Sequence, residues 1–242
     1  MKFAKYLVLL LLILVVIFSS IFSSAIRCLL IDFQDFNHQN KQLYFSSKSS
    51  ISELKALQNS ISLAQKRIAN FWEHPQKNIP IIYCNDNSSY ASFCQNSEGA
   101  GCSISTPFGN WIVINKDGLN TDVIAHEMCH IELYSSVGWW NSKTKTPAWF
   151  DEGLAMMLDY RFVAETDSLQ RFEAYKNLLK SYRIDKFDLK NLEKASNFST
   201  QSAFQNKIAY LQAGYTISKI LAKKDKKYLF LMIEEIKSKG AI

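Results

Sequence analysis

Two histidines and a glutamate in this chain are spaced so that together they could bind a metal ion and activate water. Residues 121–134 read TDVIAHEMCHIELY, so His126 and His130 are four residues apart and Glu127 follows the first histidine. On a helix, side chains four residues apart lie on one face, and two imidazoles placed in this way can bind one zinc ion. Glu127 is then positioned to accept a proton from the activated water rather than to bind the metal.

A third ligand is expected further along the chain, because a catalytic zinc ion usually takes three protein ligands and keeps one position open. Residues 147–155 read PAWFDEGLA, and Glu152 lies 22 residues after His130. The proline suits the first position of a new helix, and the intervening residues are numerous enough for the chain to reverse direction. We expect Glu152 to complete the site. Asp151, about 100° round the helix, is the alternative.

These two motifs together resemble those of the gluzincin zinc metallopeptidases. The resemblance is closest to the compact peptidase-MA-like group, whose second motif is typically Pro-x-Trp-x-x-Glu-Gly-x-Ala. It covers roughly residues 80–225 and is specific at the two motifs. It implies that His126, His130 and Glu152 are the zinc ligands and that Glu127 is the general base.

The resemblance also implies a hydrogen-bond donor for the oxyanion of the reaction, commonly a tyrosine or histidine on a later helix. Tyr210 resembles a tyrosine that the family carries after the zinc motifs, and Tyr215 is the alternative. His38 and His74 precede the motif and are expected to be exposed to solvent.

The carboxylates that would orient the histidines are less evident from the sequence. Met156 stands one turn after Glu152, where some gluzincins have an acidic residue. This leaves the orienting role unassigned, with Glu132 and Asp159 as candidates.

The N-terminal segment is uncharged for 21 residues between Lys5 and Arg27. A membrane-spanning helix needs about 20 apolar residues, whereas a cleaved signal peptide has an apolar region of about 7–15. We expect residues 1–27 to be an uncleaved anchor, with a cleaved signal and a secreted product as the alternative. The basic residues before the stretch place the N-terminus in the cytoplasm and the remainder outside it. The polar, aperiodic residues 28–48 are interpreted as a tether.

The cysteines are interpreted in the light of export, because an oxidising compartment permits disulfides. Cys84, Cys94 and Cys102 are candidates, and the pair Cys94–Cys102 brackets a short loop that contains glycine. The sequence alone leaves the pairing open. Cys28 is expected to be a free thiol, and Cys129 a buried structural thiol rather than a metal ligand.

The elements around the motifs predict an α+β fold. A capping box at Ser50 opens an amphipathic helix that runs to about Trp72. Extended segments are expected at 80–84, 102–106 and 111–115, with a hairpin between the last two.

From residue 120 the chain is predicted to be helical almost to its end. The resemblance to gluzincins implies that residues 49–242 form one zincin-like metallopeptidase domain. It has a small mixed sheet and a mainly helical C-terminal part, and one N-terminal membrane helix precedes it.

Composition and charge limit the possible partners. Eight glycines, four prolines and 13% aromatic residues exclude collagen-like and Pro/Gly-rich disordered chains. The formal net charge is +6, but Lys2, Lys5 and Arg27 flank the N-terminal stretch and supply three of those charges. The remaining charge is too small to indicate nucleic acid as a partner. The lysines near the C-terminus are interpreted as a solvated helix face.

Together these features predict a membrane-tethered, extracytoplasmic, zinc-dependent peptidase that acts on peptide or protein substrates. The resemblance implies that the substrate lies along an edge strand, at 102–106 or 111–115. Trp139 and Trp140 either line the cleft or dip toward the bilayer. The alternative is a catalytically silent zincin-fold module that binds peptides or regulates a partner, although the intact Glu127 argues against it. A zinc-stabilised structural domain is a third possibility, but a set of two His and one Glu leaves a position open that structural sites usually close.

Overall fold

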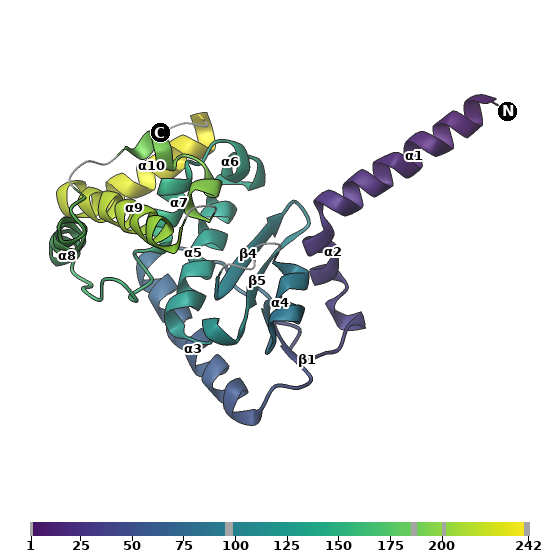
Figure 1. Ribbon diagram of the computed structural model, residues 1–242, viewed down its shortest axis with the longest axis horizontal. Helices are drawn as coiled ribbons and strands as arrows, with labels where there is room; N and C mark the ends of the chain where they lie inside the picture. Colours follow the sequence, from purple (N-terminus) through teal and green to yellow (C-terminus); the bar gives the residue numbers. More distant parts are fainter. Residues whose placement is uncertain (1, 95–98, 185–187, 200–201, 240–242) are drawn as a thin grey trace.

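A five-stranded mixed sheet forms the centre of the first half of the chain, and the second half is mostly helical (Figure 1). The computed structural model describes residues 2–94, 99–184, 188–199 and 202–239. The strand order is β1-β2-β3-β5-β4, in which β2, β3 and β5 are parallel and the two outer strands are antiparallel to their neighbours. The expected α+β class with a small mixed sheet is confirmed. The strands are β1 Phe36–Gln39, β2 Leu43–Ser46, β3 Ile81–Tyr83, β4 Gly101–Thr106 and β5 Gly109–Ile114.

Ten α-helices are described. They are α1 Lys2–Ile21, α2 Ser23–Leu29, α3 Ile51–Phe71, α4 Asn87–Phe93, α5 Thr121–Val137, α6 Trp139–Thr144, α7 Ala148–Ala155, α8 Ser168–Ser181, α9 Ala203–Lys224 and α10 Lys226–Lys239. Four short 3-10 turns accompany them, at Ile31–Phe33, Lys116–Gly118, Leu189–Leu192 and Ala195–Phe198. The capping box at Ser50 is present and opens α3 as expected.

The prediction of a tether at residues 28–48 is wrong. This segment contains the end of α2, a 3-10 turn, and the strands β1 and β2. Leu43 of β2 pairs with Ile81 of β3, so the segment supplies two of the five strands. The apolar stretch in β2 is only three residues long, which is too short for a periodic pattern, and its pairing with β3 stabilises it.

Both faces of the sheet are covered, because its central strands alternate between two apolar clusters. Ile81 and Tyr83 of β3 belong to the cluster that includes residues of α3 and α5. Ile82 and the following Cys84 belong to the cluster formed with α2 and α4. A strand buried on both faces has a continuous apolar sequence, which explains why residues 80–84 could be recognised as extended.

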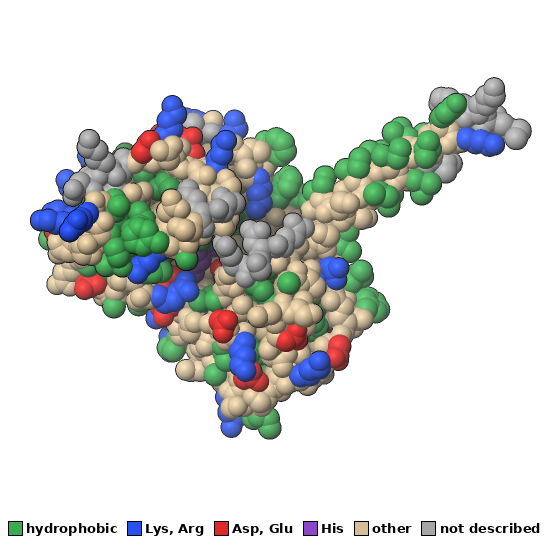
Figure 2. Space-filling model, viewed as in Figure 1, with side chains coloured by type: hydrophobic (Ala, Val, Ile, Leu, Met, Phe, Trp, Pro, Cys, Tyr) green, Lys and Arg blue, Asp and Glu red, His purple; other side chains and the backbone are tan. Residues whose placement is uncertain are grey.

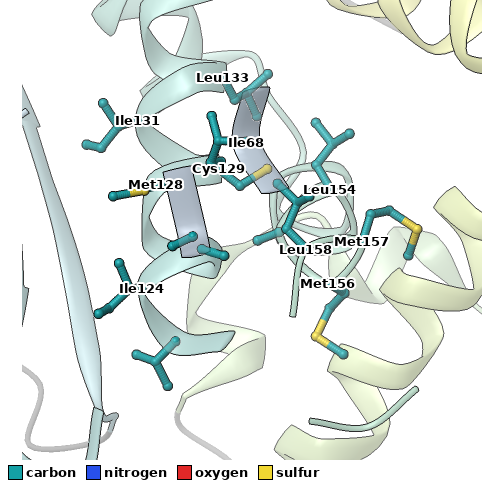
Figure 3. Close-up of a cluster of buried hydrophobic side chains, with 14 of the residues drawn as sticks. Ile68, Ile124, Met128, Cys129, Ile131, Leu133, Leu154, Met156, Met157 and Leu158 are labelled. Atoms are coloured by element: carbon teal, nitrogen blue, oxygen red, sulfur yellow. The ribbon is translucent and has the colours of Figure 1, made fainter. Parts of the chain in front are cut away.

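The helix α5 lies at the centre of the larger cluster, and its residues are buried almost without interruption. Figure 3 shows apolar side chains of α5, such as Cys129, near the apolar side chains at and just after the end of α7, such as Leu154 and Leu158. Cys129 is among them at 1% exposure, so the prediction of a buried thiol is confirmed. The helix α5 therefore combines a closely packed apolar surface with the buried polar residues of the histidine motif.

A disulfide joins Cys94 and Cys102, as the short loop between them suggested. Cys28, Cys84 and Cys129 are free and buried. Burial is the main cause that raises the pKa of the Cys84 thiol to about 12, so this residue behaves as a small apolar side chain.

The predicted helical stretch after residue 120 is interrupted between α7 and α8. Residues 156–167 form turns and coil after the end of α7. The Arg171 guanidinium donates hydrogen bonds to the backbone carbonyls of Met156, Asp159 and Glu165. A tertiary contact of this kind leaves no periodic signal in the sequence.

At the N-terminus, α1 projects away from the sheet (Figure 1), and hydrophobic side chains cover its exposed surface (Figure 2). Within the described residues, no single helix has both the length and the apolar character to cross a membrane. The helices Lys5–Ile21 and Ser23–Leu29 meet these criteria only as a pair, which is bent by 80°. The membrane anchor therefore stays a prediction.

The helices α7 and α9 approach each other closely at Gly153. A Cβ atom at this position would lie 2.6 Å from the Ala213 carbonyl oxygen and 2.6 Å from Ile217 Cγ1. Real Cβ contacts are not this short, so only glycine permits this helix separation. The contact determines how near the adjacent Glu152 comes to α5.

We expect Gly153→Ala to lower the free energy of unfolding by about 1–2 kcal/mol. Overpacking costs about 1–3 kcal/mol and the better helix propensity of alanine returns up to about 1. Urea unfolding of the full chain in detergent micelles measures the change, with the exposed Lys223→Ala on α9 as the control. Equal midpoints for both variants would contradict the close packing of α7 on α9.

Candidate metal centre

The helix α5 carries both histidines and the adjacent glutamate into the interior. It begins after Asn120, whose side chain accepts a hydrogen bond from the Val123 amide. His126 and His130 are each 6% exposed and Glu127 is 8% exposed. The ring centroids of His126 and His130 lie 4.8 Å apart, as expected for residues four positions apart on a helix.

Glu152 meets the two histidines from α7. Its Oε2 atom lies 3.4 Å from His126 Nε2 and 3.6 Å from His130 Nε2. One potential ligand atom from each of the three residues lies within 4.8 Å of the others. The helix begins at Ala148, with Pro147 as the residue before it, one position later than expected.

The donor set fits a divalent cation. Glu152 Oε2 is buried, and among the described residues it has no hydrogen-bond partner. A buried carboxylate oxygen without a partner costs free energy, and a cation between it and the two imidazoles would remove that cost. Two histidines and one glutamate are a typical ligand set for a catalytic zinc ion.

Asp151, the alternative ligand, has a different place. Its Oδ1 atom is 2.6 Å from His130 Nδ1, and its Oδ2 atom accepts a hydrogen bond from the Tyr134 hydroxyl. A carboxylate at Nδ1 requires this nitrogen to carry the proton, which leaves Nε2 free to bind a metal. Asp151 therefore orients His130, and Glu152 remains the candidate ligand.

Asp159 has the corresponding place beside His126. It is fully buried, and its Oδ2 atom is 3.5 Å from His126 Nδ1. The Arg161 guanidinium donates hydrogen bonds to both of its oxygens. Glu132, the other candidate, instead accepts hydrogen bonds from the backbone N–H of Gln76. The sequence contained no sign of Arg161, because a residue two positions from an acid in a coil has no characteristic spacing.

The carboxylates around the histidines dominate their protonation. Burial alone would lower the pKa of His126, but Asp159 and Glu152 raise it to about 10. Burial likewise opposes protonation of His130, while Asp151 and Glu152 raise its pKa to about 9. The raised pKa values favour protonated imidazoles in a chain without metal, although neither Nε2 atom is hydrogen-bonded to Glu152 Oε2, and a bound dication would compensate the carboxylates instead.

Glu127 has the properties of a proton acceptor. Burial is the main cause that raises its pKa, against the effect of His126 and His130. A carboxylate whose pKa is moved toward neutrality is better matched to accepting and returning protons. The side chain packs on β4 at Gly101, where an added Cβ would lie 3.0 Å from Glu127 Cγ.

Tyr210 is the tyrosine that α9 brings to the site. Its ring centroid is 6.2 Å from that of His126. The Glu152 charge, followed by burial, raises the pKa of Tyr210, so the hydroxyl stays protonated and can donate a hydrogen bond. Tyr215 lies about 140° further round the helix and packs on Phe172 of α8.

The other sequence-based candidates lie outside the metal centre. His38 and His74 are exposed, as expected. Trp139 donates a hydrogen bond from Nε1 to the Ser105 carbonyl of β4, and Trp140 is 65% exposed. Of the two strands expected to receive a substrate, β5 is paired on both sides and β4 is the outermost strand of the sheet.

No known protein-family model matches this chain, and no curated protein matches its sequence. The resemblance to gluzincins is therefore carried by the two motifs themselves. In the structure the two motifs lie around one point, although their nearest candidate ligands, His130 and Glu152, are 22 residues apart in the sequence.

We expect one zinc ion per chain, lost in His126→Ala and in His130→Ala. Asp151→Asn should retain the site but weaken zinc binding by about 10–100-fold, because the amide no longer holds the His130 ring as a carboxylate does. Elemental analysis and competition with a fluorescent chelator measure these effects, with the exposed His74→Ala as the control. A wild-type chain that retains no zinc would contradict the assignment.

Proposed function

We propose that this chain is a membrane-tethered, extracytoplasmic zinc-dependent peptidase, with residues 49–242, together with the strands β1 and β2 that precede them, as a zincin-like domain of the gluzincin type. The observation that carries the proposal is the convergence of His126, His130 and Glu152 on one buried point with Glu127 beside them. Donor types, spacing and burial all agree with a site for catalysis rather than for structure alone, because structural zinc sites usually have four protein ligands.

The two histidines and Glu152 would hold the zinc ion. When bound, zinc supplies Lewis-acid polarisation of the peptide carbonyl and makes water a stronger nucleophile near neutral pH. Asp151 is hydrogen-bonded to His130 Nδ1, Asp159 lies 3.5 Å from His126 Nδ1, and the Nε2 atoms of both rings face Glu152 Oε2. This orientation exists before any ligand binds, which reduces the cost of assembling the site.

Glu127 accepts the proton of the attacking water and returns it to the amine that leaves. Its burial and its position next to His126 support this role, since a general base needs a pKa near the working pH. Tyr210 donates its hydroxyl proton in a hydrogen bond to the oxyanion of the tetrahedral intermediate. The protonated state favoured by Glu152 and burial supports that role.

A peptide substrate is supported by the position of β4. This strand is the edge of the sheet and contacts α5, which carries the histidine motif. An extended peptide can pair with an edge strand through backbone hydrogen bonds. Recognition of this kind depends on the main chain, so it suits peptide or protein substrates of varied sequence.

The proposal of membrane attachment rests on the N-terminal sequence and on the surface of α1. The exposed residues of this helix are almost all apolar from Tyr6 to Ile21 (Figure 2). Residues 1–27 as an anchor, with the basic residues on the cytoplasmic side, would keep the metal centre near the outer surface of the membrane. A cleaved signal would give a secreted form.

We expect Glu127→Gln to bind zinc as the wild type does and to lose about 10²–10⁴-fold in turnover, because an amide cannot accept the proton. Hydrolysis of a mixed peptide library, followed by mass spectrometry, measures the loss, and elemental analysis checks the metal. Turnover that survives the change would refute the peptidase mechanism. A wild type that binds peptides without cleaving them would support the silent module instead.

Tyr210→Phe should lower kcat by about 10²–10³-fold with little change in KM, because the hydrogen bond forms only with the oxyanion. Tyr215→Phe on the same helix is the matched control and should leave both constants near the wild-type values. Both are measured on the peptide that the library identifies as cleaved. A larger effect of the Tyr215 change would reverse the assignment.

Protease added outside intact cells should digest the domain after residue 28, and alkaline carbonate should leave the chain in the membrane fraction. The physical reason is the uncharged stretch with basic residues before it. N-terminal sequencing separates the anchor from a cleaved signal, which would give a mature protein starting near residue 26. Protection of the domain until the membrane is lysed would overturn the proposed topology.

A further inference from the structure

A cavity of about 450 Å³ lies where α3, α8, α9 and α10 meet the coil after α7. Its size falls within the range of small-molecule sites, about 300–1,000 Å³. Met157, Leu158 and Tyr160 line it, and these residues flank Asp159, whose carboxylate contacts His126. The cavity is thus separate from the metal centre, and the polypeptide that forms one of its walls also carries Asp159.

Arg171 contributes a deeply buried positive charge to this cavity. The residue is 3% exposed, and its terminal nitrogens donate to the carbonyls of Met156, Asp159 and Glu165. Its Nε atom is buried and has no hydrogen-bond partner among the described residues. A buried charge whose hydrogen bonds all go to carbonyls, with one donor unused, is costly unless an anion approaches it.

A second guanidinium, that of Arg67, also lies over the ring of Tyr160. Arg67 is 3.9 Å and Arg171 is 4.9 Å from the centroid of this ring. Arg67 pairs with Asp122 at 2.5 Å, so its own charge is compensated, but its guanidinium still lines the cavity. Both guanidinium groups are thus in cation–π contact with one side chain that lines the cavity.

Lys226, at the start of α10, supplies a third cation. Its Nζ atom donates to the Asn70 carbonyl at 3.3 Å. In the described part of the chain neither Lys226 nor Arg171 forms an ion pair, which leaves two uncompensated positive charges around the cavity. Phe71 and Leu221 provide apolar surface beside them.

We propose that this cavity binds a small organic anion. Its carboxylate or phosphate group would lie among Arg67, Arg171 and Lys226, and its apolar part would pack on Phe71 and Leu221. Guanidinium groups bind both kinds of anion through charge-assisted hydrogen bonds. The apolar walls distinguish such a ligand from a simple inorganic ion.

The test uses the full chain in neutral detergent micelles, treated with a chelator so that no metal ion can bind the probe. Isothermal titration compares benzoate with benzamide, which has the same shape without the charge, and with inorganic phosphate. We expect benzoate to bind at millimolar concentration and benzamide to bind at least about tenfold more weakly, because only benzoate pairs with the cations.

Lys226→Met should weaken benzoate binding by about tenfold, since it removes one charge and retains an apolar chain. Lys227→Met, at the next and exposed position, is the matched control and should bind as the wild type does. Phosphate binding in the absence of benzoate binding would overturn the assignment of an organic ligand. Equal binding of benzoate and benzamide, equal effects of the two lysine changes, or no binding of either benzoate or phosphate would overturn the site itself.

Discussion

Glu152 Oε2 lies 3.4 and 3.6 Å from the Nε2 atoms of His126 and His130, in an interior where an unpaired carboxylate costs free energy. Two further carboxylates, Asp151 and Asp159, lie at the opposite nitrogens of the same rings. Attraction between these groups is strong only while the helices hold them together and water is excluded. The arrangement of α5, α7 and the coil after α7 satisfies this requirement.

Close helix packing makes this possible. Gly153 lets α7 approach α9, and Gly101 lets β4 approach α5 beside Glu127. Neither contact leaves room for a Cβ atom without a shift of its neighbours. The small residues therefore set the distances across the site, while the apolar cluster on α5 keeps it dry (Figure 3).

The coil between α7 and α8 links the candidate metal centre to the neighbouring cavity. The Asp159 carboxylate contacts His126, and Arg171 donates hydrogen bonds to the backbone carbonyls of Met156 and Asp159. Backbone carbonyls in this coil do not accept helical hydrogen bonds and instead accept hydrogen bonds from the Arg171 guanidinium. This exchange is why a segment next to two helices is irregular and still fully buried at Asp159.

The sequence by itself determined the α+β class, the motif helix and the candidate set of His126, His130 and Glu152, with Asp151 as the alternative ligand, because these depend on spacings along one chain. It left the pairing of Cys84, Cys94 and Cys102 open, and the structure joins Cys94 to Cys102. Tertiary structure alone decided that residues 28–48 join the sheet and that Asp159 faces His126. Strand pairing and contacts to an irregular coil join segments that are distant in sequence, and no local periodicity records them.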